Sequence, residues 1–350
     1  MSLLWLLVFI PISLISAFNQ LNPILIFFTS SLAILPLAKL MGDATEMLAK
    51  QLNSNLSALL CASVGTIPDI IIGGFALSHG LVEVVKAAIT GAIIGNLLFG
   101  LGMAITIGGI IRRQALSFDH KNVHLHGGLL LLASIGLIIP AIFDFSTLSE
   151  EEISLEVSVV LLLTYLLSVI FTFTDPEPEP GFSHQPHQEN QPETFPFKSK
   201  QLAFGVLLGS TAIIAVMSEL LTDALEPAAQ TMGLTPIFTG IFLLAPVGNA
   251  VEFINASRFA KANQLDISLA STMGSSTQMA LLAAPLLVFI GYFLQQPMNL
   301  IFSKFQVVSI ILAVVAVNNV MNFGQVRWIS GAKLISTYLI LAIGFYAAPY

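Results

Sequence analysis

Charged residues are scarce in this chain. Only 9% of its 350 residues are Asp, Glu, Lys or Arg, whereas 55% are hydrophobic and the mean hydropathy is +0.88. Water-soluble domains carry about 25% charged residues, so the composition excludes an ordinary soluble domain and predicts an all-α polytopic membrane protein. The net charge of -7 provides no basic surface that would favour nucleic acid as a partner.

Other absences exclude further classes of protein. Cys61 is the single cysteine, so the chain has no disulfide framework. The apolar runs contain no cluster of Cys and His, which argues against a copper site or a zinc site built on thiolates. No phosphate-binding Gly-Lys-Ser/Thr loop is present, which disfavours an ATP-driven pump. No basic region precedes the first apolar run, from Ser2 to Ala17, so we expect a retained helix there. We expect no enzymatic activity and no resident cofactor.

Long apolar runs fill most of the chain. A helix needs roughly 17 to 25 apolar residues to cross a bilayer, and we predict about eleven such spans. Their expected residues are 3–18, 22–41, 56–78, 84–110, 127–143, 153–173, 202–222, 234–257, 267–293, 305–322 and 332–348.

The basic residues predict an orientation for these spans. Eleven of the 13 Lys and Arg residues fall on one side, and only Lys86 and Lys304 on the other. Because basic loops remain in the cytoplasm, we expect the N-terminus inside and the C-terminus outside. A short N-terminus and a compact linker favour a prokaryotic plasma membrane.

One short motif occurs twice. The segment Gly65-Thr66-Ile67-Pro68-Asp69 aligns with Gly248-Asn249-Ala250-Val251-Glu252 when the sequence is shifted by 183 positions. A stretch rich in Pro, Glu, Gln and His separates the two halves and is typical of a flexible linker. We predict an extra N-terminal helix in 1–20, a five-helix repeat in 21–174, a cytoplasmic linker in 175–200 and a second five-helix repeat in 201–350. Five crossings per repeat invert the second repeat, as in many secondary transporters.

Each motif places an acid, Asp69 or Glu252, inside an apolar span. Such a carboxylate costs several kcal/mol unless something compensates its charge, so the pair predicts a cation or proton site. The prolines and glycines of the motifs interrupt the helices and free carbonyls that can face a cation. A hard cation such as calcium takes six to eight oxygen ligands. The predicted metal-site residues are Asp69, Glu252, Thr66, Asn249, Gly65, Gly248, Ser275, Ser276 and Gln278.

Two paired carboxylates also suit exchange, because they can hold one divalent ion or release it when protons bind. Ser275, Ser276 and Gln278 have an alternative role as hydrogen-bonding groups between closely packed helices. Glu219 and Glu83 are candidates for a proton pathway. The alternative is a structural ion pair for Glu219 and a favourable helix-terminus charge for Glu83.

Several segments together resemble the calcium/proton antiporters of the cation/calcium exchanger superfamily along nearly the whole chain. They are 36–39 with 42–46, 80–86, 89–91 with 95–98, 218–221, 246–252 and 274–278. The resemblance implies an eleven-helix fold and exchange of cytosolic calcium for protons, with Asp69 and Glu252 as the ion-binding pair. The expected partners are the cation, protons and the lipid bilayer.

The departures from this family are concentrated in the first half. The family usually has Gly-Asn-Ala-Pro-Glu where this chain has Gly65 to Asp69, and two usual serines are Ala88 and Ala92. In the second half, Phe253 replaces a usual histidine and Gln306 a usual acid. Asp is shorter than Glu by one methylene, and calcium–oxygen distances of about 2.3 to 2.6 Å leave little slack.

These departures leave three hypotheses besides calcium exchange. The chain could exchange Na⁺, K⁺, Mn²⁺ or Mg²⁺, or it could be a non-transporting scaffold with a depleted first-half site. An intramembrane aspartyl protease is disfavoured, because Asp69 does not follow Gly-x-Gly and Glu is a poor member of that dyad.

Overall fold

The computed structural model describes residues 3–49, 52, 60, 64–118, 120–142, 150–174, 199–321 and 324–347. The predicted linker lies outside these residues apart from Ser199 and Lys200. The helices of the first half are η1 (Leu3–Val8), α1 (Phe9–Phe18), α2 (Pro23–Ala49), α4 (Ile67–Ser78), α5 (Val82–Ile94), the π-helical segment η2 (Gly95–Gly100), α6 (Leu101–Arg112), α7 (His120–Ile142) and α8 (Glu150–Thr174).

The second half begins with α9 (Lys200–Met232), α10 (Pro236–Thr239), the π-helical segment η3 (Gly240–Leu244) and α11 (Ala245–Lys261). It continues with α12 (Leu265–Gln278), the π-helical segment η4 (Met279–Ala283), α13 (Ala284–Phe293), α14 (Lys304–Met321) and α15 (Trp328–Ala347). Strands β1 (Leu116–Ser117) and β2 (Gln325–Val326) pair antiparallel, with Leu116 opposite Val326.

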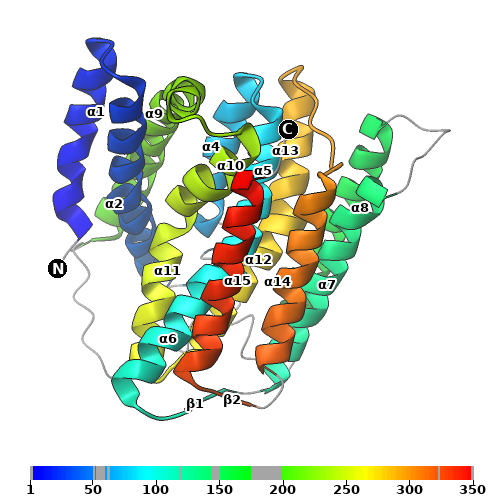
Figure 1. The fold of residues 1–350 in the computed structure, drawn as a ribbon. Coiled ribbons are helices and arrows are strands. Elements are labelled where there is room, and N and C mark those ends of the chain that lie inside the picture. Colours follow the sequence, from blue (N-terminus) through cyan, green and yellow to red (C-terminus); the bar gives the residue numbers. More distant parts are fainter. Residues whose placement is uncertain are drawn as a thin grey trace.

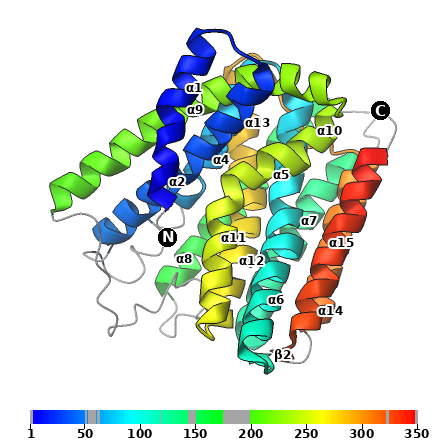
Figure 2. The same cartoon turned by 60° about the vertical axis from the view of Figure 1, so that its left-hand side comes forward.

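The all-helical membrane architecture is confirmed. Among the described residues, eight helices are long and apolar enough to cross a membrane, and three shorter apolar helices cover Leu3–Phe18, Ile67–Ser78 and Gly127–Pro140. A described helix overlaps each predicted span, while the number of crossings and the repeat boundaries stay predictions. Figures 1 and 2 show one helical bundle, with α1, α2 and α9 together on one side of it.

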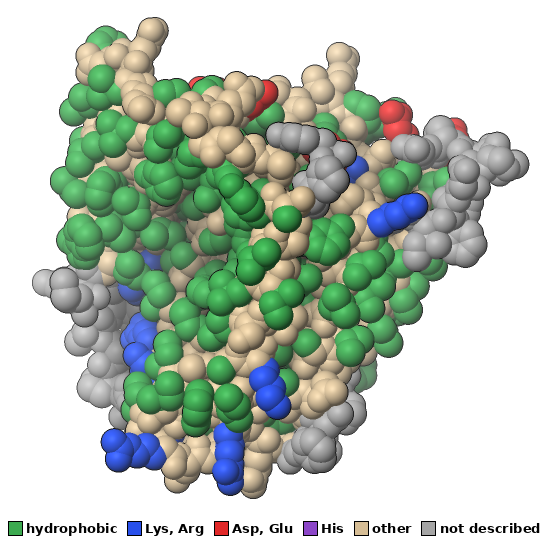
Figure 3. Space-filling view, viewed as in Figure 1, with side chains coloured by type: hydrophobic (Ala, Val, Ile, Leu, Met, Phe, Trp, Pro, Cys, Tyr) green, Lys and Arg blue, Asp and Glu red, His purple; other side chains and the backbone are tan. Residues whose placement is uncertain are grey.

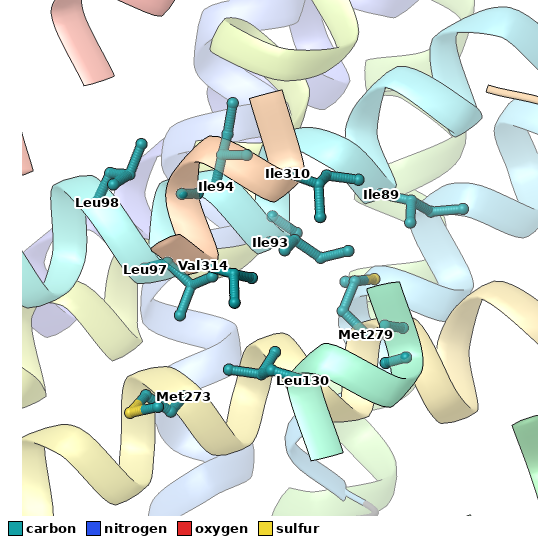
Figure 4. Close-up of a cluster of buried hydrophobic side chains, with 14 of the residues drawn as sticks. Ile89, Ile93, Ile94, Leu97, Leu98, Leu130, Met273, Met279, Ile310 and Val314 are labelled. Atoms are coloured by element: carbon teal, nitrogen blue, oxygen red, sulfur yellow. The ribbon is translucent and has the colours of Figure 1, made fainter. Parts of the chain in front are cut away.

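The middle of the bundle is built around α5 and η2. Apart from a few polar residues this segment is apolar, and such a helix is stable only when other helices surround it. Ile93, Ile94 and Leu97 are fully buried and meet side chains from α7, α12 and α14. Figure 4 shows Ile93 and Leu97 on the side of the helix that faces Leu130 and Val314, whereas Ile94 points away from them, as Leu98 does. This core fixes α5 beside the helices that carry the second motif.

Glycines allow two close helix contacts next to the motifs. A Cβ added to Gly91 of α5 would lie 2.6 Å from the Cα of Ile241 in η3, and a Cβ on Gly240 would overlap the Val84 carbonyl. Only a residue without a side chain permits this approach of two backbones. The contact positions α11, which continues from η3, against α5.

Candidate cation site

The two motif helices are interrupted, but in different ways. In the first half a turn at Thr66 separates helical Val64 and Gly65 from α4, and Asp69 lies in the first turn of α4. In the second half η3 runs directly into α11, and Glu252 lies two turns inside that helix. Pro68 lies at the start of α4, where its missing N–H removes no intrahelical hydrogen bond. Pro246 instead lies where the helix continues from η3 into α11, so it removes one backbone donor without ending the helix. The first predicted interruption is therefore present, whereas the second is only a change from π-helical to α-helical geometry.

The first motif contacts the second through Asp69. Its Oδ1 lies against the backbone of Gly248, where an added Cβ would overlap it, and its Cγ would be 3.0 Å from that Cβ. Asp69 and Glu252 are also close enough for their charges to interact. Both side chains are half-buried and surrounded by the bundle. The structure thus brings the predicted acids into one site.

A cluster of polar side chains lies around Glu252. Asn96 of η2 donates hydrogen bonds from Nδ2 to Asn249 Oδ1 (2.8 Å) and to Ser275 Oγ (3.2 Å). Asn249 in turn donates to the carbonyl of Ala245 (2.8 Å). Asn96 and Ser275 also face the Glu252 carboxylate as hydrogen-bonding groups. Two other helical segments, η2 and α12, therefore converge with α11 on this acid.

Two oxygens of this cluster have no hydrogen-bond partner among the described residues. They are Glu252 Oε2 and Asn96 Oδ1, and both are buried. Buried polar oxygens are nearly always satisfied by a donor, water or a cation. With the Asp69 carboxylate they form an oxygen-rich set, which is the ligand type of hard cations.

Other predicted ligands differ in how they are placed. Ser276 donates to the carbonyl of Thr272 (2.9 Å) and lies 3.4 Å from that of Ile93, so it joins two helices. Gln278 is half-buried at the end of α12, and its side chain makes no hydrogen bond within the described part of the chain. Thr66 is buried at the turn before α4, whereas Gly65 is exposed and an added Cβ there would contact nothing within 4 Å.

The proton-pathway candidates do not join the acid pair. The Glu219 side chain is exposed on α9. Glu83 is exposed in the first turn of α5 and forms an ion pair with the buried Lys86 (3.0 Å), which also donates to Asn299 Oδ1 (3.0 Å). The pairing fits the helix-terminus role for Glu83 better than a place beside Asp69.

The departures from the family pattern have visible consequences. Ala92 is buried, and the shift of 183 positions makes it the counterpart of Ser275, so the first half lacks that hydroxyl. Phe253 is buried against Gly100 and the ring of Phe99 (centroids 5.5 Å apart). Gln306 accepts a hydrogen bond from the Ser303 N–H (2.8 Å) at the start of α14, and this bond caps the helix.

Two further polar contacts were not expected from the sequence. The π-helical segment η2 places Asn96 beside Glu252. In the sequence, the only sign of this role is an amide side chain within an apolar run. His79 after α4 pairs through Nε2 with Asp223 Oδ1 of α9 (2.7 Å). Nothing in the sequence spacing links these two residues, since they are far apart in the chain.

Comparison with known proteins gives consistent matches. The sodium/calcium exchanger protein family matches residues 22–174 and 202–347. A Ca(2+)/H(+) antiporter of Synechocystis is 36% identical, covering 98% of this chain and 96% of the relative. One of Aphanothece halophytica is 35% identical over the same shares.

Solved structures show the same fold. Native YfkE superposes with a TM-score of 0.85 at 28% identity, covering 99% of this chain and 100% of that one. The H⁺/Ca²⁺ exchanger CAX gives 0.74 at 18% identity, covering 98% and 91%, and this likeness shows the fold alone.

Proposed function

The chain belongs to the sodium/calcium exchanger protein family, and on that premise we propose that it is a secondary antiporter that exchanges Ca²⁺ for protons. One observation carries this proposal. Asp69 of the first motif packs on Gly248 of the second, beside Glu252 and its polar neighbours, inside an apolar bundle. A membrane protein retains such carboxylates when they serve a cation or proton pathway.

The ligand chemistry suits calcium. Asp69 and Glu252 would supply negative charge, and the unpartnered Asn96 Oδ1 together with Ser275 Oγ would supply neutral oxygens. Carbonyls near the helix interruptions and water would complete a shell of six to eight ligands.

The two charges also explain coupling. One divalent ion neutralises both carboxylates, and so do two protons, so the site is electrically similar in both loaded forms. An unloaded pair would leave two charges in a medium of low dielectric constant. The site is therefore expected to move between the two sides of the membrane with calcium or protons bound, and not when it is empty.

The charge distribution supports an orientation in the membrane and hence a direction of transport. In the view of Figure 3, most Lys and Arg side chains lie in the lower half, toward the end that carries β1 and β2, while acidic side chains and a few basic ones lie near the opposite end. We propose that the basic end faces the cytoplasm of a prokaryotic cell, with the N-terminus inside and the C-terminus outside. Calcium would then leave the cell as protons enter. We expect no enzymatic activity and no resident cofactor.

The decisive experiment is calcium uptake into inverted vesicles that contain the purified protein, driven by an imposed pH gradient. Asp69→Asn and Glu252→Gln should each abolish uptake. Glu226→Gln is a matched control, because Glu226 is an exposed acid on α9 that pairs only with Gln230 in the described part of the chain. Calcium binding without uptake would identify a non-transporting scaffold.

Exchange of another cation is the second candidate, and the depleted first half favours it. Na⁺, K⁺, Mn²⁺ and Mg²⁺ should be tested as competitors of calcium uptake. Because Thr66 and Asp69 replace the Asn and Glu of the family pattern, the double variant Thr66→Asn, Asp69→Glu should raise calcium affinity. An unchanged affinity would show that these substitutions do not set the choice of ion.

A further inference from the structure

A cavity of about 470 Å³ lies at the end of the bundle far from the acid pair. The end of α6, the chain that leads to β1, and the start of α15 surround it, and these segments are at the end of the molecule that carries β1 and β2 (Figure 1). The pairing of Leu116 with Val326 holds the two chain segments together. An added Cβ on Gly109 would lie 2.8 Å from the Trp328 backbone nitrogen, so α6 and α15 are in close contact here. The pairing of β1 with β2 and the close contact of α6 with α15 therefore hold the walls of the cavity in place.

The cavity is positively charged. Arg113 and Arg327 line it, and no acidic side chain is among the described residues of its lining. Arg113 ends α6 in the left-handed conformation (φ 55°), with its N–H bonded to the Gly109 carbonyl (3.0 Å). Arg327 directly precedes α15, whose N-terminal end adds partial positive charge. Two guanidinium groups and a helix N-terminus together form a binding site suited to a phosphate group.

Apolar side chains flank this cavity on the outer surface. Ile110 and Ile111 at the end of α6, and Trp328 and Ile329 at the start of α15, are all exposed. Tryptophan is enriched where the headgroups of a bilayer meet its hydrocarbon core, and exposed isoleucines beside it fit acyl chains. Figure 3 shows basic side chains next to apolar surface at this end of the bundle. An apolar rim of this kind is what a cavity at headgroup depth would have.

We propose that this cavity binds the phosphate of an anionic phospholipid from the adjacent leaflet. Arg113 and Arg327 contact the phosphate, and the acyl chains lie along the exposed isoleucines. A free phosphate ion would use the arginines but not the apolar rim. The rim therefore favours a lipid as the ligand. This inference does not depend on the transport activity.

The two tryptophans of the chain provide a direct test. They are Trp5 and Trp328, so replacing the exposed Trp5 with Phe leaves Trp328, at the cavity itself, as the single tryptophan to be excited selectively. The full chain is placed in vesicles of phosphatidylcholine that contain increasing fractions of brominated phosphatidylglycerol. A second series contains brominated phosphatidylcholine instead. Bromine quenches the indole on contact, so the curves report which lipid occupies the site.

Phosphatidylglycerol should quench Trp328 at a lower fraction than phosphatidylcholine, with a preference of up to roughly 30-fold, the value that two arginines at a membrane surface supply. Arg113→Gln or Arg327→Gln should each reduce that preference roughly 5-fold. Arg258→Gln is the matched control. It removes an exposed positive charge of α11 outside the cavity lining, and it should leave the preference nearly unchanged.

Several outcomes overturn the proposal. Equal quenching by the two lipids shows that no selective site exists, and an equal effect of all three arginine changes shows only general surface attraction. Inorganic phosphate is then compared with sodium chloride at the same ionic strength. If the cavity binds lipid, the preference for phosphatidylglycerol falls equally in phosphate and in sodium chloride. If the preference falls more in phosphate than in sodium chloride, the cavity holds the free phosphate ion instead.

Discussion

Replacing Gly248 with alanine should weaken calcium binding roughly 100-fold, while the same change at Gly65 should leave it intact. The two glycines are equivalent in sequence, since a shift of 183 positions superposes them. In the structure they differ. A methyl group on Gly248 would overlap the Oδ1 atom of Asp69, whereas a methyl group on Gly65 would have nothing within 4 Å.

The size of the effect follows from this overlap. A carbon and an oxygen that are not bonded stay about 3 Å or more apart, so the Asp69 carboxylate would have to move by roughly 1 Å. Calcium–oxygen distances span only about 2.3 to 2.6 Å, and a displacement of that size removes the ligand. Loss of one partner from a buried charge pair costs about 3 kcal/mol or more, which corresponds to roughly 100-fold in calcium affinity.

The assay is titration calorimetry of calcium into the purified protein in detergent, at one pH. Binding is measured instead of flux, because binding reports the arrangement described above without requiring turnover. Gel filtration and thermal unfolding check that Gly248→Ala is folded. If it is not, the double variant Gly248→Ala, Asp69→Ala removes the overlap and should fold as Asp69→Ala does.

Two results would refute this reasoning. If Gly248→Ala binds calcium like the parent, Asp69 does not ligate the ion from its position on Gly248. If Gly65→Ala loses affinity as strongly as Gly248→Ala, the difference between the two motifs is not real.

Three further predictions concern the surroundings of the site. Asn96→Ala should lower calcium affinity in the same titration and cost about 1 to 3 kcal/mol of stability, because Asn249 Oδ1 loses its donor; unchanged affinity would exclude Asn96 from the site. Gly91→Ala should destabilise the protein by about 1 to 3 kcal/mol in thermal unfolding, since its methyl group would overlap Ile241, whereas Gly128→Ala has open space and should not. Calcium binding should weaken as the pH falls, because protons neutralise the carboxylates that attract the ion; titrations that give one affinity at every pH would contradict proton competition.

The positions of the helices were largely predictable from the sequence, because apolar length and bilayer thickness are directly related. The ends of the helices were less predictable. The predicted span 22–41 is helical to Ala49, and the predicted span 202–222 is helical to Met232. Hydropathy detects only the apolar part of a helix, whereas backbone hydrogen bonding continues through polar residues such as Asp43, which pairs with Lys39 one turn away (2.9 Å).

The acid pair was predicted, but much of its surroundings was not. A carboxylate in an apolar run is visible in the sequence because burial makes it costly. The contacts of Asn96 with Asn249 and Ser275 join residues more than 150 positions apart. Lys86, predicted only to lie at the less basic end of the span 84–110, is buried in α5 because Glu83 and Asn299 satisfy its charge and hydrogen bonds.

By itself the sequence determined a membrane-spanning helical protein with two acids at matched positions, since composition and local pattern decide both. It could not distinguish the environments of Gly65 and Gly248, because the repeated motif carries nearly the same local information in each copy. Only the packing of the two halves places the Asp69 carboxylate on one glycine and leaves the other exposed. That difference arises from contacts between distant segments, which a local pattern does not contain.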